Sequence, residues 1–357
     1  MLRKISVIAL LFCLTTAANA QEDSTEKKSK FTFTGAIDGY FRSDFKSNVA
    51  NNRTSFTNTT GKLALGMIEA KLDYAGEKFG FTADLAAGKR QKEFAYNDKG
   101  VLSYVKQLYA YYTPTDWLKL TAGTWGTHVG YELMEPYVNK NYSMSYMFSY
   151  GPFLQTGLKA DFSFGESSDF MIGVSNATDY RDPPNPNKKS FLMQYSQNIT
   201  DEVSILLNYI GNQRPTDMAK IRQFEVLFIY NITDKFSADL NATINTTRMK
   251  TGSGYDKAKA WSGIATYLNY TPSKKFDLTL RTEVFNDKYQ LSALSTAIKG
   301  GTILANTLTA NIAFGNLSII PELRWESATN NVFYAKDGTP KGSSGSFLIG
   351  AYYKFSK

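Results

Sequence analysis

The sequence predicts an all-β protein: a transmembrane, antiparallel up-and-down β-barrel of about sixteen strands, spanning residues 31–357. Three observations predict it. Apolar and polar side chains alternate with a period of two, which is typical of strands and not of helices. The alternating segments have about the length, roughly 9–11 residues, that a tilted strand needs to cross a bilayer. The connections between them are short and long in turn, as in outer-membrane barrels.

The first thirty residues precede the barrel and read as a targeting leader. Arg3 and Lys4 form a basic start, followed by a short apolar core and a small-x-small site that ends at Ala20. This pattern predicts a secretory signal peptide over residues 1–20, cleaved after Ala20. Residues 21–30, "QEDSTEKKSK", are polar and of mixed charge, which predicts a short leader without a core of its own.

Composition excludes several classes of function. Cys13 is the only cysteine, it lies in the signal peptide, and Phe12 before it does not suit lipidation. The remaining chain therefore has no disulfide and no cysteine-based zinc site. Removing Arg3 and Lys4 lowers the formal net charge from +8 to +6, and no block of basic residues suggests nucleic acid. We expect no cofactor.

The alternation is clearest in "FSADLNATINTT", residues 236–247. Phe236, Leu240 and Ile244 fall on one face, while Asp239 and Thr243 fall on the other. A helix would bring residues three and four apart together and would mix these two classes. The sixteen predicted strands lie near 31–42, 62–75, 79–90, 101–113, 117–125, 152–164, 169–179, 190–199, 203–212, 223–232, 236–247, 260–270, 276–287, 301–314, 317–328 and 345–355.

The connections predict which end of the barrel faces which compartment. Seven are short, at 76–78, 114–116, 165–168, 200–202, 233–235, 271–275 and 315–316. Eight are longer and polar, at 43–61, 91–100, 126–151, 180–189, 213–222, 248–259, 288–300 and 329–344. Tight periplasmic turns and long external loops are typical of outer-membrane barrels, and seven turns with eight loops fit sixteen strands.

Large aromatic residues bracket most of the short turns. Tyrosine and tryptophan combine an apolar body with a polar tip, so they favour the level where hydrocarbon meets water. We therefore predict a periplasmic aromatic girdle. Its members are Tyr74, Phe79, Tyr112, Trp117, Phe164, Phe170, Tyr230, Phe236, Tyr270, Phe276 and Phe355. The alternative, a β-sandwich, would direct these rings into a shared core and explains neither their position nor the polar second face.

The second face of the strands is too charged for a dry core, because unpaired buried charges are very costly. It suits a water-filled lumen, and sixteen strands give a barrel wide enough for one. Ten acidic and six basic residues are predicted to point inward: Asp38, Arg42, Asp73, Asp84, Arg90, Lys119, Lys159, Asp161, Glu225, Asp239, Asp277, Arg281, Glu283, Glu322, Arg324 and Glu326. A phase change near Met67 and a proline at Pro321 each predict a bulge or distortion.

The longest external connection, 126–151, is rich in tyrosine, methionine and glycine. A long loop with its own apolar residues is usually packed against something. We interpret it as folding into the lumen and narrowing it. Its residues Tyr131, Glu132, Glu135, Tyr137 and Lys140 would then face the charged wall. The alternative is a self-packed external cap, which fits the loop length equally well.

The same region carries a resemblance to a known family. G-Y-E at 130–132, N-Y-S at 141–143 and the pattern S-x-x-F-x-x-G-P-F-x-x-T-G from Ser145 to Gly157 resemble the OmpL-like outer-membrane β-barrel porins of Bacteroidota. Gln155 stands where that pattern leads us to expect histidine. The resemblance implies an outer-membrane diffusion channel and names no substrate.

Residues for catalysis are scarce. His128 is the only histidine, and it lies in Gly-Thr-His-Val-Gly with no serine-centred nucleophile motif nearby. We therefore expect no enzyme and no metal site, and interpret His128 as a polar residue of the pore rim or loop. An outer-membrane hydrolase that uses His128 is a remote alternative.

The resulting hypothesis is a porin in the cell outer membrane, multi-pass, which lets small hydrophilic solutes or ions diffuse passively. Its expected partners are outer-membrane lipid, those solutes and the barrel-assembly machinery, with a homotrimer left open and nucleic acid excluded. The main alternative is a closed barrel that acts as a surface receptor or adhesin. The exposed loops 43–61, 180–189 and 329–344 would carry that activity.

Overall fold

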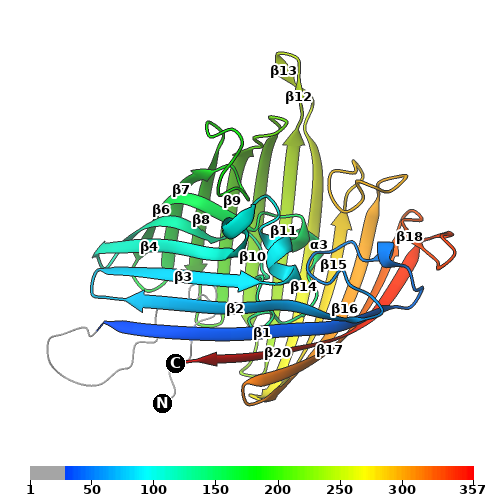
Figure 1. The fold of residues 1–357 in the computed structure, drawn as a ribbon, viewed down its shortest axis with the longest axis horizontal. Helices are drawn as coiled ribbons and strands as arrows, with labels where there is room; N and C mark the ends of the chain where they lie inside the picture. The colour runs from blue at the N-terminus through cyan, green and yellow to red at the C-terminus, as the bar shows by residue number, and fades with distance from the viewer. Residues whose placement is uncertain (1–28) are drawn as a thin grey trace.

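The computed structural model describes residues 29–357, so the predicted signal peptide lies outside the described residues, as does most of the leader. Sixteen strands form one closed barrel in which every neighbouring pair described is antiparallel, and β1 pairs with β20 to close it (Figure 1). The strands are β1 (Lys30–Asp44), β2 (Leu63–Ala75), β3 (Phe79–Ala87), β4 (Val105–Thr115), β5 (Leu118–Gly126), β6 (Leu154–Phe164), β7 (Ser168–Asn176), β8 (Lys189–Asn198), β9 (Val203–Gln213), β10 (Lys220–Asn231), β11 (Phe236–Arg248), β14 (Lys259–Ser273), β15 (Phe276–Asn286), β16 (Thr302–Phe314), β17 (Leu317–Ala328) and β20 (Ser343–Ser356). The predicted all-β barrel is confirmed.

Short connections gather at one end of the barrel, here called the short-turn end, and long connections at the other, the long-loop end. Both ends of the barrel sequence lie at the short-turn end, because Lys30 pairs with Ala75 there and Thr34 pairs with Ser356. The longest connection, residues 127–153 between β5 and β6, starts from the long-loop end. We call it the inner segment.

Small elements missed by the alternation pattern lie in the long connections. They are η1 (Val49–Asn51), α2 (Lys89–Phe94), η2 (Gly100–Tyr104), α3 (Tyr146–Ser149) and the two hairpins β12 (Lys250–Thr251) with β13 (Gly254–Tyr255) and β18 (Phe333–Tyr334) with β19 (Pro340–Lys341). The β12–β13 hairpin projects beyond the barrel in Figure 1. No helix within the described residues is long and apolar enough to cross a membrane.

The predicted strand over 79–90 is too long. It ends at Ala87, and Gly88 follows with φ of 129°, a conformation that favours glycine. A Cβ at Gly88 would also collide with the carbonyl oxygen of Gly66. The chain then enters α2, so Arg90 lies on a helix and not on a strand of the wall as predicted.

The two faces of the strands differ as the alternation requires. On β10, Phe224 is 53% exposed on the outer face, whereas the neighbouring Glu225 is buried inside. On β14, Leu268 is exposed and Tyr267 is buried. The barrel therefore presents an apolar belt outward and a polar interior, which is the arrangement of a barrel that spans a membrane.

Both predicted irregularities have a counterpart in the strand pairing. Asp38 of β1 lies opposite Met67 of β2 and Gly39 lies opposite Leu65, so one extra residue on β2 forms a bulge next to Met67. Pro321 pairs with β20 in continuous register. Its ladder with β16 is interrupted without a register shift, because proline has no N–H to donate. The distortion at Pro321 is thus a gap and not a bulge.

Candidate functional site

The inner segment crosses the interior of the barrel and is tied to its wall on several sides. Four of its tyrosine hydroxyls donate hydrogen bonds to carboxylates on β1, β2, β11 and β17. The four bonds join Tyr131 to Asp239 (2.7 Å), Tyr137 to Glu69 (2.8 Å), Tyr142 to Asp38 (2.5 Å) and Tyr146 to Glu326 (2.7 Å). Asp38, Glu69 and Glu326 lie within the consecutive strands β17, β20, β1 and β2, whereas Asp239 lies on β11 in another part of the wall, so the four bonds hold the segment across the interior.

One buried ion pair fixes the centre of the inner segment. Arg281 of β15 pairs with Glu132, and both side chains are almost completely buried. The guanidinium also donates to the carbonyl of Ser143 at 2.8 Å and to the hydroxyl of Thr307 at 3.2 Å. The second oxygen of Glu132 accepts the backbone N–H of Ser145 at 2.7 Å. A buried pair of this kind is stable only when such additional bonds satisfy its remaining donors and acceptors.

A second charged cluster surrounds Lys106. Its ammonium group forms ion pairs with Glu69, with Asp84 at 2.8 Å, and with Glu135 of the inner segment. Sequence alternation missed Lys106 because β4 bulges at this point: Asp84 pairs with Gln107, and the next residue of β3 pairs with Val105. The extra residue turns the lysine inward. Counting the alternation back from the aromatic residues of β4 places Lys106 on the outer face. This unfavourable position for a charge could have indicated the bulge.

Acidic wall residues also bind the backbone of the inner segment. Glu283 accepts the N–H groups of Tyr146 and Met147, each at 2.9 Å, at the start of α3. Glu225 accepts the N–H of Gly130 at 2.6 Å, and Glu322 accepts that of Tyr142 at 3.0 Å in the same way. These bonds satisfy donors that would otherwise be buried without partners. The acidic excess of the inner face is therefore explained in part by the carboxylates that accept backbone N–H groups of the inner segment.

Basic and amide side chains bind the carbonyls of the inner segment in turn. Arg324 donates to the carbonyl of Met144 at 2.9 Å, and Asn311 donates to that of Lys140 at 2.9 Å. Arg90, on α2, donates to the carbonyl of Met134 at 3.1 Å. The inner segment is therefore held through both its side chains and its backbone.

The remaining wall residues of the sequence prediction divide by depth. Lys119, Lys159 and Asp277 are only partly buried, and Lys159 pairs with Asp161 at 2.9 Å. Lys119 and Asp277 each lie close to a short turn. Toward the long-loop end, Arg42 pairs with Asp44 at 3.8 Å, and Arg90 approaches Asp38 at 3.7 Å while its guanidinium lies over the ring of Tyr142. The interior is thus more open to solvent toward the short-turn end.

His128 lies at the start of the inner segment and is half-buried. Its Nε2 lies 3.1 Å from the carbonyl oxygen of Tyr209, and its Nδ1 has no partner within the described part of the chain. Burial lowers the pKa of His128 to about 4, so the ring is neutral at ordinary pH. Gln155, where histidine was expected, accepts a hydrogen bond from Ser175 at 2.8 Å inside the barrel.

The aromatic residues around the short turns lie on the outer face. Phe79 stacks on Tyr112 across β3 and β4, with 4.5 Å between ring centroids, and Phe236 stacks on Tyr270 at 4.6 Å. The other members are at least partly exposed: Tyr74, Trp117, Phe164, Phe170, Tyr230, Phe276 and Phe355. Their level along the strands is that of the short turns.

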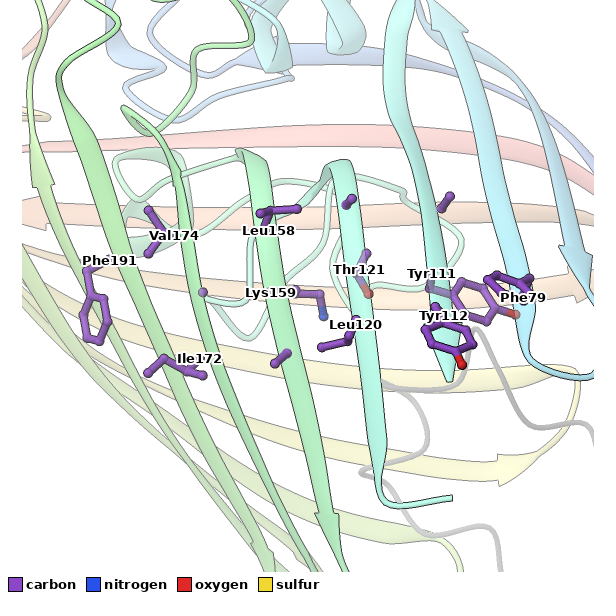
Figure 2. Close-up of a pocket in the computed structure, with 14 residues that line it drawn as sticks. Phe79, Tyr111, Tyr112, Leu120, Thr121, Leu158, Lys159, Ile172, Val174 and Phe191 are labelled. Carbon is purple, nitrogen blue, oxygen red and sulfur yellow. The ribbon is translucent and has the colours of Figure 1, made fainter. Parts of the chain in front are cut away.

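A shallow apolar groove of about 710 Å³ lies on the outer face of β3–β8. Figure 2 shows Leu120, Leu158 and Val174 on successive strands of this area. The groove forms where Ala110 and Ala122 leave room between such larger side chains. Because its lining is almost entirely apolar, the groove belongs to the belt that faces lipid.

These features define a class: a closed, sixteen-stranded outer-membrane barrel with an apolar outside, a charged inside and a segment folded into it. The chain belongs to the family described as "Putative beta-barrel porin-2, OmpL-like", whose model matches residues 30–355. It is thus a porin, a passive-diffusion channel of the outer membrane. None of the curated protein sequences matches it.

Solved structures of outer-membrane proteins share the fold at low sequence identity. Outer-membrane expressed OmpT of Vibrio cholerae superposes with a TM-score of 0.60 at 12% identity, covering 94% of this chain and 100% of that one. The outer membrane channel DcaP of Acinetobacter baumannii gives 0.60 at 10%, covering 93% and 99%. An anion-selective porin from Comamonas acidovorans gives 0.59 at 10%, covering 92% and 100%. At these identities the likeness concerns the fold alone.

Proposed function

We propose that the barrel passes small hydrophilic solutes or ions through a water-filled lumen and that the inner segment is its constriction. The observation that carries this proposal is the set of bonds from the inner segment to carboxylates on β1, β2, β11 and β17. A segment anchored on several sides of a barrel reduces its free cross-section. The constriction residues are Tyr131, Glu132, Glu135, Tyr137 and Lys140.

The charges near the short-turn end support the polar nature of the transported solute. Lys119, Lys159 and Asp277 are partly exposed inside the barrel, where they contact water and not lipid. Charges of both signs lie along this part of the wall. We infer that hydrated ions and polar solutes pass here, while apolar solutes meet an unfavourable environment.

We further propose that the short-turn end faces the periplasm, with the aromatic girdle at that membrane boundary and the long loops outside. The amphipathic rings at the level of the turns support this orientation. Residues 1–20 would act as the signal peptide, cleaved after Ala20, and the barrel-assembly machinery would insert the strands. A homotrimer is the assembly that we propose to test by cross-linking in native membranes.

Recording from planar lipid bilayers tests the proposal. The purified protein is expected to give discrete conductance steps in KCl, and deletion of residues 132–145 is expected to enlarge each step. The matched control removes residues 250–255, the β12–β13 hairpin, which projects away from the barrel and should leave conductance unchanged. Heat-dependent mobility on gels verifies that each variant is folded. A folded barrel without conductance would refute the channel and favour a surface receptor or adhesin.

A further inference from the structure

A hollow of about 480 Å³ opens among the long loops, above the end of the inner segment. Tyr96, Tyr150 and Tyr180 line it, together with the ends of β9, β10 and β11. A second hollow of about 350 Å³ shares Tyr96 and Tyr150 with the first. We call the two together the mouth cleft. Each has the size of a small-molecule site, and their shared boundary makes the cleft elongated.

The larger hollow offers no free charge to a ligand. Arg214 and Asp217 in its lining neutralise each other in an ion pair of 3.0 Å. Asp179, the remaining charged residue of that lining, accepts hydrogen bonds from the N–H groups of Phe153 (2.7 Å) and Leu154 (3.0 Å) and from the hydroxyl of Tyr96 (3.0 Å). An ionic ligand would lose its hydration without gaining a counter-ion, which disfavours it. In the smaller hollow, Glu93 already accepts hydrogen bonds from the N–H of Phe56 (2.7 Å) and the side-chain NH2 of Asn58 (2.8 Å), so the composition of both hollows favours a neutral ligand.

Uncharged polar groups with unused hydrogen-bonding capacity converge on the same hollow. Asn212 is partly exposed at this hollow and accepts through its side-chain oxygen from Ser190 at 3.0 Å, so its NH2 group is the part of the amide that would donate to a ligand. Asn245 donates through its NH2 group to Gln223 at 3.0 Å, so its side-chain oxygen is the part of the amide that would accept from a ligand. The hydroxyl of Ser292 is buried, with the residue only 7% exposed, and finds no partner in the described chain. A buried hydroxyl of this kind requires a partner, and a hydroxyl-bearing ligand supplies one while also offering bonds to the two amides.

Rigid aromatic rings complete the lining. The hydroxyl of Tyr150 donates to the carbonyl of Arg53 at 2.8 Å, which fixes the ring at the boundary between the two hollows. The ring of Trp261 packs against Phe285 with 5.3 Å between centroids. The faces of such rings carry partial negative charge and attract the C–H groups of a ligand. A sugar ring has a C–H face and a rim of neutral hydroxyls, so it matches both parts of the lining.

We propose that the mouth cleft binds a neutral oligosaccharide at the outer entrance of the channel. The proposal names the solute class of the function proposed above and rests on it. The aromatic rings stack on the sugar faces, and Asn212, Asn245 and Ser292 exchange hydrogen bonds with the hydroxyls. The elongated shape favours two or three linked sugar units over a single one.

Calorimetric titration of the purified, detergent-solubilised protein tests the proposal, with maltotriose, cellotriose and chitotriose as the probes. At least one trisaccharide is expected to bind, and the variants Asn212→Leu and Tyr180→Ala are expected to weaken that binding about tenfold or more each. The matched control Asn187→Leu, on an exposed loop residue, should bind as the unchanged protein does. A poly(ethylene glycol) of similar mass should give no heat.

The outcomes separate this inference from the channel function. Absence of binding by all three trisaccharides, or binding that both variants leave unchanged, overturns the inference. KCl conductance, measured on the same preparations, reports the channel independently of any sugar. Conductance without sugar binding therefore refutes the oligosaccharide site alone, whereas sugar binding without conductance refutes the channel alone.

Discussion

Replacement of Arg281 by methionine removes the guanidinium that ties the inner segment to β15. The change leaves Glu132, which is 3% exposed, as a buried carboxylate without its counter-ion, and it also removes the bond to the carbonyl of Ser143. Removing one partner of a buried ion pair costs about 3–5 kcal/mol. Each 1.4 kcal/mol is about a tenfold change in an equilibrium. Detachment of the inner segment should therefore become about a hundred- to a few thousandfold more frequent.

Other anchors limit the effect. The four bonds from tyrosine hydroxyls to wall carboxylates contribute about 1.5–3 kcal/mol each, since hydrogen bonds to charged groups are the stronger ones. The segment should thus remain docked most of the time. In single-channel recording the variant is expected to show brief, frequent steps to higher conductance, and its unfolding in urea should shift to lower concentration.

Adding Glu132→Gln to Arg281→Met provides the decisive comparison. The amide removes the stranded charge yet still accepts the N–H of Ser145, so the double variant should recover much of the lost stability. Arg248→Met is the matched control, because Arg248 is exposed near the β12–β13 hairpin. If Arg281→Met behaves like the control, or the double variant is no better than the single one, the ion pair does not hold the segment.

Three further outcomes follow from the same geometry. Tyr142→Phe removes the hydroxyl that donates to Asp38 and should lower the free energy of unfolding by about 1–3 kcal/mol. The control Tyr104→Phe, on an exposed ring, should leave it unchanged. Equal urea midpoints for the two variants would contradict this prediction. Burial raises the pKa of Asp179 from 3.8 to about 6, so the folded state binds the proton more tightly than the unfolded chain does. The free energy of unfolding should therefore fall as pH rises from about 4 to 6. This pH dependence should vanish in Asp179→Asn, and urea midpoints measured across that range would show it. Gly88→Ala places a Cβ in a strained φ and against the backbone of Gly66, and should lower the free energy of unfolding by about 1–3 kcal/mol in the same assay. An unchanged urea midpoint would show that the turn relaxes freely.

The strands could be predicted closely because a lipid-facing belt imposes a period of two on every one of them. Predicted and observed bounds agree within a few residues for most strands, including 317–328 for β17. The exceptions arise where local geometry overrides alternation. Gly88 ends β3 early and sends Arg90 into a helix, and a bulge turns Lys106 inward against the phase of its strand. A break in the alternation indicated the bulge next to Met67, but the insertion at Lys106 has to be found by comparing the phase of each residue along its strand.

The partners of the inner segment could not be predicted for a different reason. Its composition indicates packing, but bonds such as that from Tyr146 to Glu326 join residues 180 positions apart. Nothing local in the sequence pairs a given tyrosine with a given carboxylate. The mouth cleft was missed likewise, because Asn212, Asn245 and Ser292 come from separate connections and strands and converge only once the barrel closes.

The anchoring of the inner segment also sets an order on assembly. Its partners include Asp38 on the first strand and Glu326 on the fifteenth, and these two strands flank β20 only when β20 has joined β1. Contacts between residues so distant in sequence form slowly, because loop closure must precede them. The inner segment therefore gains its complete set of anchors only after the barrel has closed, so closure of the wall precedes final docking.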